Sequence, residues 1–250
     1  MSTIKTKIEH SQKIIRKILE EFPKMGVGCS FGKDSMVVVD IARKIKPDIP
    51  IFSVMTMYKP IETINYLMVM QRTMHLNLTV FMVTNPIPIF AGQDSNFMTL
   101  KRAGTKVESI GSSEFFKKDT LKNPLHFIDP AKCCHLLKVI PAKYAIKKLG
   151  LGAYLSGIRN DEGETRANFQ PIEKDGEIIK VNPIITWTEL DVWKYLALNQ
   201  IKPNPLYNEG YRSLGCLPCS AITGDDGPER AGRWQGKEKE ECGLHKKEKQ

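Results

Sequence analysis

The amino-acid sequence predicts an α/β fold with a Rossmann-like, mostly parallel sheet and helices on both faces, followed by an irregular C-terminal segment and a mobile tail. Residues 51–57 form an apolar run of strand length without polar alternation, which is typical of a strand buried on both faces. Segments of strand type alternate with helical patterns of about 10–15 residues, as in βαβ units. A short stretch rich in glycine and serine separates the first such strand from the helix that follows it.

The expected elements follow one another with short breaks. The charged first 24 residues predict an amphipathic helix with isoleucines on its inner face. Strands are expected at residues 25–28, 51–57, 78–83, 153–157 and 181–185. Further helices are expected at residues 35–46, 61–75, 134–149 and 188–198. Residues 88–130 show no clear period and predict loops and short helices, and the proline- and glycine-rich chain from residue 202 onward predicts irregular structure.

Length and composition indicate an ordinary soluble globule. The 250 residues fit one large α/β domain, expected at residues 1–224, with a functional tail at 225–250. The net charge of +9 suits an anionic substrate or an acidic partner protein, and it is compatible with nucleic acid, which is not the expected partner. No apolar segment approaches the ~18 residues of a membrane span, and the first residues lack the apolar core of a signal peptide. A cytoplasmic protein without membrane contact is therefore expected.

The glycine- and serine-rich stretch, VGCSFGKDS at residues 27–35, has the layout of a strand, a phosphate-binding turn and a helix N-terminus. Gly28 and Gly32 would allow close backbone approach and unusual φ angles. Lys33 offers a positive charge, and Ser30 and Ser35 offer hydroxyls. The spacing differs from the G-x-x-x-x-G-K-[ST] pattern. It resembles the S-G-G-x-D-S PP-loop of the adenine-nucleotide α-hydrolase superfamily, with phenylalanine in place of the first glycine.

Four of the six cysteines form two tight pairs, Cys133 with Cys134 and Cys216 with Cys219. In a chain without an export signal, such pairs indicate metal or redox chemistry rather than disulfides. Structural zinc and a [4Fe–4S] cluster are the two candidates. Because side chains of adjacent residues diverge, a cubane with separate irons accommodates the first pair better than one zinc ion does.

Cys242 stands apart from these pairs, on a charged stretch near the end of the chain. Structural cysteines are usually buried in a core. A cysteine on a mobile polar tail is better interpreted as a thiolate nucleophile that visits the active site.

Together these motifs resemble the assimilatory sulfonucleotide reductases, specifically their iron–sulfur adenylylsulfate (APS) reductase branch. The matching motifs, in chain order, are CCHLLK (133–138), GIR (157–159) with TR (165–166), GCLPC (215–219), ERAGRW (229–234) and ECGLH (241–245). Each motif alone is weak, but five in this order are highly specific and the resemblance covers nearly the whole chain.

The resemblance implies a reaction. The Cys242 thiolate would attack the sulfur of the sulfonucleotide, release AMP and form an S-sulfocysteine. A thioredoxin- or glutaredoxin-like thiol would then release sulfite by thiol exchange. A [4Fe–4S] cluster on the four paired cysteines would organise the site rather than carry electrons. A homo-oligomer is also expected.

The resemblance also implies the substrate ligands. The expected phosphosulfate ligands are Arg159, Arg166, Arg230 and Arg233. The expected ligands at the phosphate end are Ser30, Gly32, Lys33 and Ser35. Lys138 would add positive potential between cluster and substrate, and His245 would lie beside the thiolate.

Two departures from the family pattern keep other functions open. The intact K-D-S of the loop is closer to enzymes that split ATP between the α and β phosphates, which favours an ATP-pyrophosphatase-type sulfurtransferase acting on nucleic acid. Residues 54–57 read VMTM where the family has L-D-T-G near the adenine, which leaves open a 3′-phosphoadenylyl sulfate (PAPS) reductase with a cluster. A redox-sensing binding protein that carries a cluster is a third alternative, and it would not need Cys242.

Overall fold

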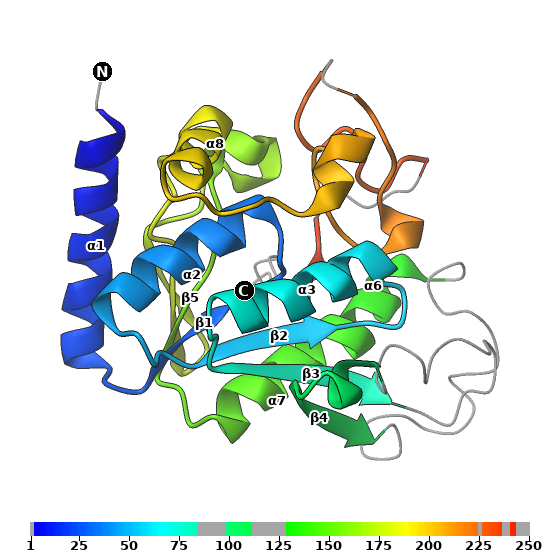
Figure 1. Ribbon diagram of the computed structural model, residues 1–250, viewed down its shortest axis with the longest axis horizontal. Helices are drawn as coiled ribbons and strands as arrows, with labels where there is room; N and C mark the ends of the chain where they lie inside the picture. The colour runs from blue at the N-terminus through cyan, green and yellow to red at the C-terminus, as the bar shows by residue number, and fades with distance from the viewer. Residues whose placement is uncertain (1–2, 85–98, 112–128, 225–226, 237–240, 244–250) are drawn as a thin grey trace.

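The computed structural model describes residues 3–84, 99–111, 129–224, 227–236 and 241–243. Its centre is a seven-stranded sheet with the strand order β4-β3-β2-β1-β5-β7-β6 (Figure 1). All neighbouring strands are parallel except β6 and β7, which form an antiparallel pair at one edge. The predicted α/β fold with a mostly parallel sheet is confirmed.

The strands are short and the helices are of ordinary length. The strands are β1 (Met25–Gly28), β2 (Ile51–Met55), β3 (Leu78–Thr84), β4 (Lys106–Gly111), β5 (Ala153–Leu155), β6 (Ile172–Asp175) and β7 (Ile178–Val181). The helices are α1 (Ile4–Glu21), α2 (Lys33–Ile45), α3 (Ile61–Thr73), α6 (Pro130–Cys134), α7 (Ile140–Lys148) and α8 (Glu189–Leu198). A π-helical turn, His135–Val139, joins α6 to α7.

Helices cover both faces of the sheet. The largest apolar cluster combines the buried sides of α1, α2, α3 and α8 with β1, β2 and β3. On the opposite face, α7 packs Ala145 and Ile146 against Phe52 and Phe81 of β2 and β3 (Figure 1). This double cover explains why the central strands are apolar without alternation. Within the described residues, no helix combines the length and apolarity that crossing a bilayer requires.

Several expected boundaries are wrong. No strand lies at residues 181–185, because the strand at this edge is β7, which ends at Val181. The segment 88–130 was expected to contain only loops and short helices, but it includes β4. The helix expected from Cys134 begins at Pro130, with Asp129 as its N-cap. Strands β2 and β5 end two residues before their expected ends, so the residues that follow them form the loops at the carboxyl edge of the sheet.

The turn after β1 places its backbone strain on Phe31 rather than on glycine. Phe31 has φ 61°, in the left-handed region. Gly32, the N-cap of α2, has an ordinary φ of −88°, so the expectation of unusual φ at the loop glycines is wrong. The Phe31 ring is fully buried and meets Tyr66 edge-on, with ring centroids 6.4 Å apart. Burial of the ring thus stabilises a backbone conformation that glycine would adopt without strain.

We expect Phe31→Gly to lower the free energy of unfolding by roughly 2 kcal/mol, because a loss of about 3–5 kcal/mol of ring packing exceeds the relief of about 1–2 kcal/mol at the left-handed residue. Phe31→Ala should be more destabilising than Phe31→Gly, because it loses the ring and keeps the strain. Urea unfolding of both variants measures the order. An alanine variant more stable than the glycine variant would contradict this account.

Candidate active site

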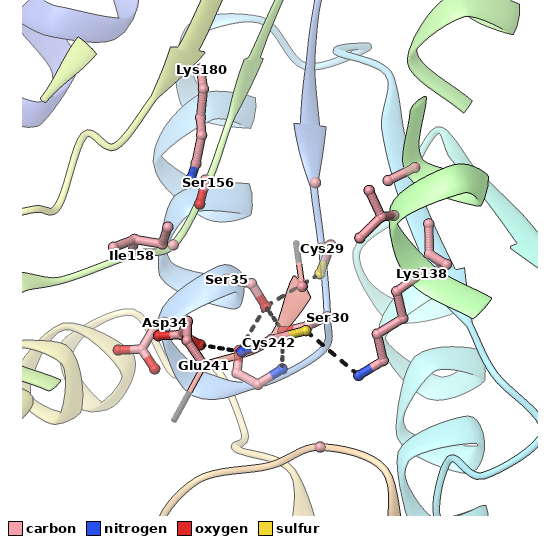
Figure 2. A pocket seen from close by; sticks show the side chains of 18 of the residues that line it. Cys29, Ser30, Asp34, Ser35, Lys138, Ser156, Ile158, Lys180, Glu241 and Cys242 are labelled. Atoms are coloured by element: carbon pink, nitrogen blue, oxygen red, sulfur yellow. Dashed lines mark hydrogen bonds between the residues drawn. The ribbon is translucent and has the colours of Figure 1, made fainter. Parts of the chain in front are cut away.

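A cavity of about 1240 Å³ opens at the carboxyl ends of β1 and β5. It is lined by the phosphate loop after β1, the π-helical turn, the β6–β7 hairpin and the C-terminal segment. Figure 2 shows the side chains of the loop on one side and Lys138 of the π-helical turn on the other. Ligands of open parallel sheets bind at this edge, so the cavity lies where the fold predicts a site.

The phosphate loop presents small polar groups to the cavity. Ser30, Gly32 and Ser35 line it, as expected. The Ser35 hydroxyl donates to the Gly32 carbonyl at 2.9 Å and lies 3.3 Å from the Ser30 hydroxyl (Figure 2). Burial raises the pKa of the Cys29 thiol to about 11. Cys29 is therefore protonated near neutral pH, which agrees with the interpretation of this cysteine as a small residue at the end of a strand.

Gly157 sets the distance between the phosphate loop and the end of β5. A Cβ atom on Gly157 would lie 2.8 Å from the Ser35 backbone nitrogen and 2.9 Å from the Asp34 carbonyl carbon. Backbone atoms at the start of α2 cannot move away as a flexible side chain could. The glycine of the GIR motif is therefore required for the close approach of the loop after β5 to the N-terminus of α2.

Lys33 reaches the site but is held by carboxylates. Its ammonium forms a short contact with Glu229 and lies 3.5 Å from Asp34 and 3.7 Å from Glu189. Burial alone would lower the pKa of Lys33, but Asp34, Tyr207 and Glu229 outweigh it and raise that pKa. Lys33 lines the cavity with its ammonium held on carboxylates, and its role as a phosphate ligand stays a prediction.

Arg159 lies behind the cavity rather than in its wall. Its side chain is fully buried, and its Nε donates to Asp34 at 2.5 Å. Its Nη2 donates to both carboxylate oxygens of Glu229, at 2.8 and 2.7 Å. Arg159 is absent from the residues that line the described part of the cavity. Its donors are engaged by the two carboxylates, and its expected role as a direct phosphosulfate ligand stays a prediction.

Arg166 and Arg230 line the cavity and share one carboxylate. Arg166 binds Glu241 through Nε at 2.8 Å and Nη2 at 3.2 Å, and it also contacts Glu162. Arg230 donates from Nη2 to Glu241 at 2.8 Å. The two arginines are thus brought together as expected, but a protein carboxylate lies between them.

Arg233 is the expected arginine with the least neutralised charge. It lines the cavity, donates from Nη1 to the Leu214 carbonyl at 2.6 Å and stacks 4.5 Å from the Trp234 ring. Its Nε is buried without a hydrogen-bond partner within the described residues. A Cβ on Gly215 would lie 2.3–2.5 Å from the guanidinium, so this glycine makes room for it. An anion in the cavity would supply the missing acceptor.

The Cys242 thiol lies in the same cavity. It is 8% exposed, and its Sγ is 4.0 Å from the Nζ of Lys138 (Figure 2). Lys59, which the sequence did not single out, also lines the cavity. Burial and the nearby charge of Lys138 lower the pKa of Lys59 to about 8. Lys138, Lys59 and Arg233 therefore surround the thiol with positive charge that favours its thiolate form.

The four paired cysteines line one small cavity next to the large one, together with Thr56, Lys138 and other residues. In the part of the chain that the structure describes, none of the four forms a disulfide. The Thr56 hydroxyl lies 3.1 Å from the Cys216 sulfur. Burial raises the pKa of the Cys216 thiol, but Lys138, Lys59 and Thr56 outweigh this effect and lower it below the usual value. The two pairs of the sequence therefore meet in space, and the surroundings of Cys216 favour its thiolate.

Lys180 and His245 complete the comparison between the expected and the observed site residues. Lys180 of β7 lines the cavity, and its ammonium lies 4.8 Å from the centroid of the Phe169 ring. It lies in none of the motifs of the sequence. His245 lies outside the described residues. The mobility of the tail and the domain boundary at residue 224 stay predictions.

A family comparison identifies this arrangement. The model of the phosphoadenosine phosphosulfate reductase domain matches residues 24–222. The chain belongs to this family. Adenosine 5′-phosphosulfate reductase 1 of Bacillus subtilis is 34% identical over 87% of this chain and 82% of its own length. Adenosine 5′-phosphosulfate reductase of Mycobacterium tuberculosis is 35% identical over 84% of this chain and 72% of its own.

Solved structures share the fold of this family member. A phosphoadenylyl-sulfate (PAPS) reductase from Candida auris superposes with a TM-score of 0.61 at 23% identity, over 83% of this chain and 88% of its own. An FMN adenylyltransferase from Candida glabrata gives a TM-score of 0.59 at 11% identity, over 98% and 78% of the two chains. At these identities the likeness concerns the fold alone.

The affinity of the site for AMP should fall as the pH rises from 7 to 9. Burial lowers the pKa of Lys180 to about 8, against the opposing effect of Glu173 and Asp175, so its positive charge is present below pH 8 and lost above it. The loss can weaken binding of the dianion by up to roughly tenfold. Calorimetric titration with AMP measures the effect. In Lys180→Met this pH dependence should weaken to the part that Lys59 contributes, because Lys59 lines the same cavity and its pKa is also about 8. The exposed Lys194→Met should keep the full dependence.

Proposed function

We propose that this protein reduces adenylyl sulfate to sulfite and AMP through an S-sulfocysteine on Cys242, within sulfate assimilation. The observation that carries the proposal is the burial of Cys242, from the end of the chain, in the cavity of the phosphate loop, 4.0 Å from the Lys138 ammonium. Two relatives named adenosine 5′-phosphosulfate reductase, which are 34% and 35% identical to this chain, support the proposal.

In the first half-reaction the protein positions an anion against a thiolate. The phosphate end of the nucleotide lies at Ser30, Gly32 and Ser35, where hydroxyls and the N-terminus of α2 favour negative charge. The sulfate lies toward Lys138 and Arg233. The Cys242 thiolate attacks the sulfur, a sulfur–sulfur bond forms, and the bond from sulfur to the bridging oxygen breaks. That oxygen and its electron pair leave with AMP.

In the second half-reaction a dithiol partner of the thioredoxin or glutaredoxin type completes the reduction. One partner thiolate attacks the Cys242 sulfur and forms a mixed disulfide, and sulfite leaves with the electron pair of the broken sulfur–sulfur bond. The second partner thiol then resolves the mixed disulfide and restores the Cys242 thiol. The dithiol is oxidised by two electrons, which balances the reduction of sulfate to sulfite.

The cysteines Cys133, Cys134, Cys216 and Cys219 fit a [4Fe–4S] cluster better than zinc. Sulfurs on one tetrahedral zinc ion lie about 3.8 Å apart, because each zinc–sulfur bond is about 2.3 Å. In the described part of the chain, no three cysteine sulfurs lie within 4.8 Å of one another. The three side chains whose ligand atoms do lie that close are the carboxylates of Asp34, Glu162 and Glu229. Wider spacing suits a cubane. When bound, the cluster would add charge and organise the residues around Lys138.

The alternatives receive less support from the site. A sulfurtransferase that cleaves ATP would use Lys33 on the phosphates, but Glu229 and Asp34 hold this ammonium. A PAPS reductase needs cations for a 3′-phosphate, and the relatives with 34–35% identity carry the APS name. A redox-sensing protein has no use for Cys242 in the cavity. The cytoplasmic location and the homo-oligomer stay predictions.

Incubation with APS and no thiol should add one SO3 unit, about 80 Da, to Cys242 and release one AMP per active site, as expected for covalent catalysis. Intact mass and peptide mapping measure the adduct. Cys242→Ser should abolish it and leave the iron content unchanged. PAPS should react at least roughly tenfold more slowly, equivalent to about 1.4 kcal/mol of transition-state binding. Cleavage of ATP to AMP and pyrophosphate would instead indicate the sulfurtransferase.

Anaerobically prepared protein should carry about four irons and four sulfides per chain. Metal analysis and the visible absorption spectrum measure this content. Cys216→Ser should lose the cluster and part of the C-terminal packing, since ligand binding there also stabilises the fold. Stoichiometric zinc without iron would overturn the cluster assignment.

A further inference from the structure

Glu241 is the residue immediately before the nucleophile, and its carboxylate is buried among donors. Arg166 binds it in a two-pronged manner, through Nε at 2.8 Å and Nη2 at 3.2 Å. Arg230 donates to it at 2.8 Å, and the Thr165 hydroxyl lies at 3.4 Å. The backbone N–H of Cys242 donates to the same carboxylate at 2.7 Å. One side chain therefore links the nucleophile's own backbone to two arginines of the cavity wall.

Residues 241–243, the nucleophile segment, are held from two sides. Glu241 binds the arginines at one end. At the other end Gly243 packs so closely on the π-helical turn that an added Cβ would lie 3.1 Å from Val139 and 3.3 Å from Cys134. Cys242 lies between these anchors, with its sulfur toward Lys138. The apolar anchor at Gly243 offers little area, so the charge-assisted bonds of Glu241 supply most of the directional contact.

This geometry separates two groups of cations in the cavity. Arg166 and Arg230 are occupied by Glu241, whereas Lys138 and Lys59 lie near the Cys242 sulfur and Arg233 lies near these two lysines. Within the described residues, none of these three cations forms an ion pair with a carboxylate. Cys242 thus lies beside Lys138 while the Glu241 carboxylate stays bound to Arg166 and Arg230. Docking and binding of the sulfate by the second group are therefore compatible.

We propose that Glu241 is a positioning residue that docks the nucleophile: its carboxylate, held by Arg166 and Arg230, fixes Cys242 over the sulfate end of the cavity. The claim that docking aids catalysis rests on the proposed function, whereas the claim that Glu241 docks Cys242 does not. It assigns Arg166 and Arg230 primarily to the enzyme's own C-terminal segment and leaves the sulfate to Lys138, Lys59 and Arg233.

The test uses cluster-loaded protein and the Glu241→Gln variant, which keeps the shape and removes the charge. Without substrate, the rate at which iodoacetamide alkylates Cys242, followed by peptide mapping, should rise at least roughly tenfold, because the buried thiol is released more often. With APS, the single-turnover rate of adduct formation should fall about tenfold to hundredfold, while the calorimetric affinity for AMP changes by less than about twofold. Glu164→Gln changes an exposed carboxylate two residues before Arg166, and it should leave both rates unchanged.

An unchanged rate of alkylation in Glu241→Gln would overturn the proposal. If AMP also bound more tightly in that variant, the carboxylate would merely compete with the nucleotide for the arginines. If the glutamine variant does not fold or loses iron, Glu241→Asp keeps the charge and withdraws the carboxylate by one methylene, and it should raise alkylation to an intermediate rate. A wild-type rate there would also overturn the proposal. Alkylation needs no substrate, so it decides this inference even if APS is not turned over.

Discussion

The buried guanidinium of Arg159 is the interaction on which the site depends. It joins Asp34 at the start of α2 to Glu229 in the C-terminal segment, and it is itself placed by the loop after β5. Taking one partner out of such a network leaves an uncompensated buried charge and typically costs about 3–5 kcal/mol. Through Glu229 the network brings the neighbouring Arg230 and Arg233 to the sheet. Ion pairs therefore fix the C-terminal segment to the carboxyl edge, in addition to the apolar packing of Trp234 and Cys242.

The sequence predicts the central sheet well because its strands are buried on both faces, which leaves apolar runs such as residues 51–55. It fails at the edges for a physical reason. Strand β4 reads KVESIG, with polar residues between the apolar ones, and it pairs only with β3. Ile184 and Ile185 are apolar and buried without lying in a strand, because Ile184 belongs to the main core and Ile185 packs with Ile158 and Phe169. An apolar run in the sequence indicates burial. It indicates a strand only where the burial arises within a sheet.

The site shows a similar limit. Motifs identified Arg166, Arg230, Arg233, Lys138 and Cys242, and the structure brings all five to one cavity. They could not show which cations are already neutralised, because pairings such as Arg166 with Glu241 form only in the folded chain. Lys59 lies outside the motifs, yet its burial beside Lys138 makes it part of the positive surroundings of the thiol. Charge pairing is a property of the folded chain, whereas residue type can be read from the sequence.

The π-helical turn lies between the two cavities, and its Lys138 lines both of them. One face of this helix carries Cys133 and Cys134 toward the cysteine cavity, and Lys138, within the turn, points to the Cys242 sulfur. Gly243 packs against Cys134 of the same helix. A π-helical turn inserts one extra residue and changes the direction of the side chains after it, which lets Cys134 and Lys138 serve adjacent cavities. A rearrangement of Cys134 would therefore reach the surface on which the nucleophile segment rests.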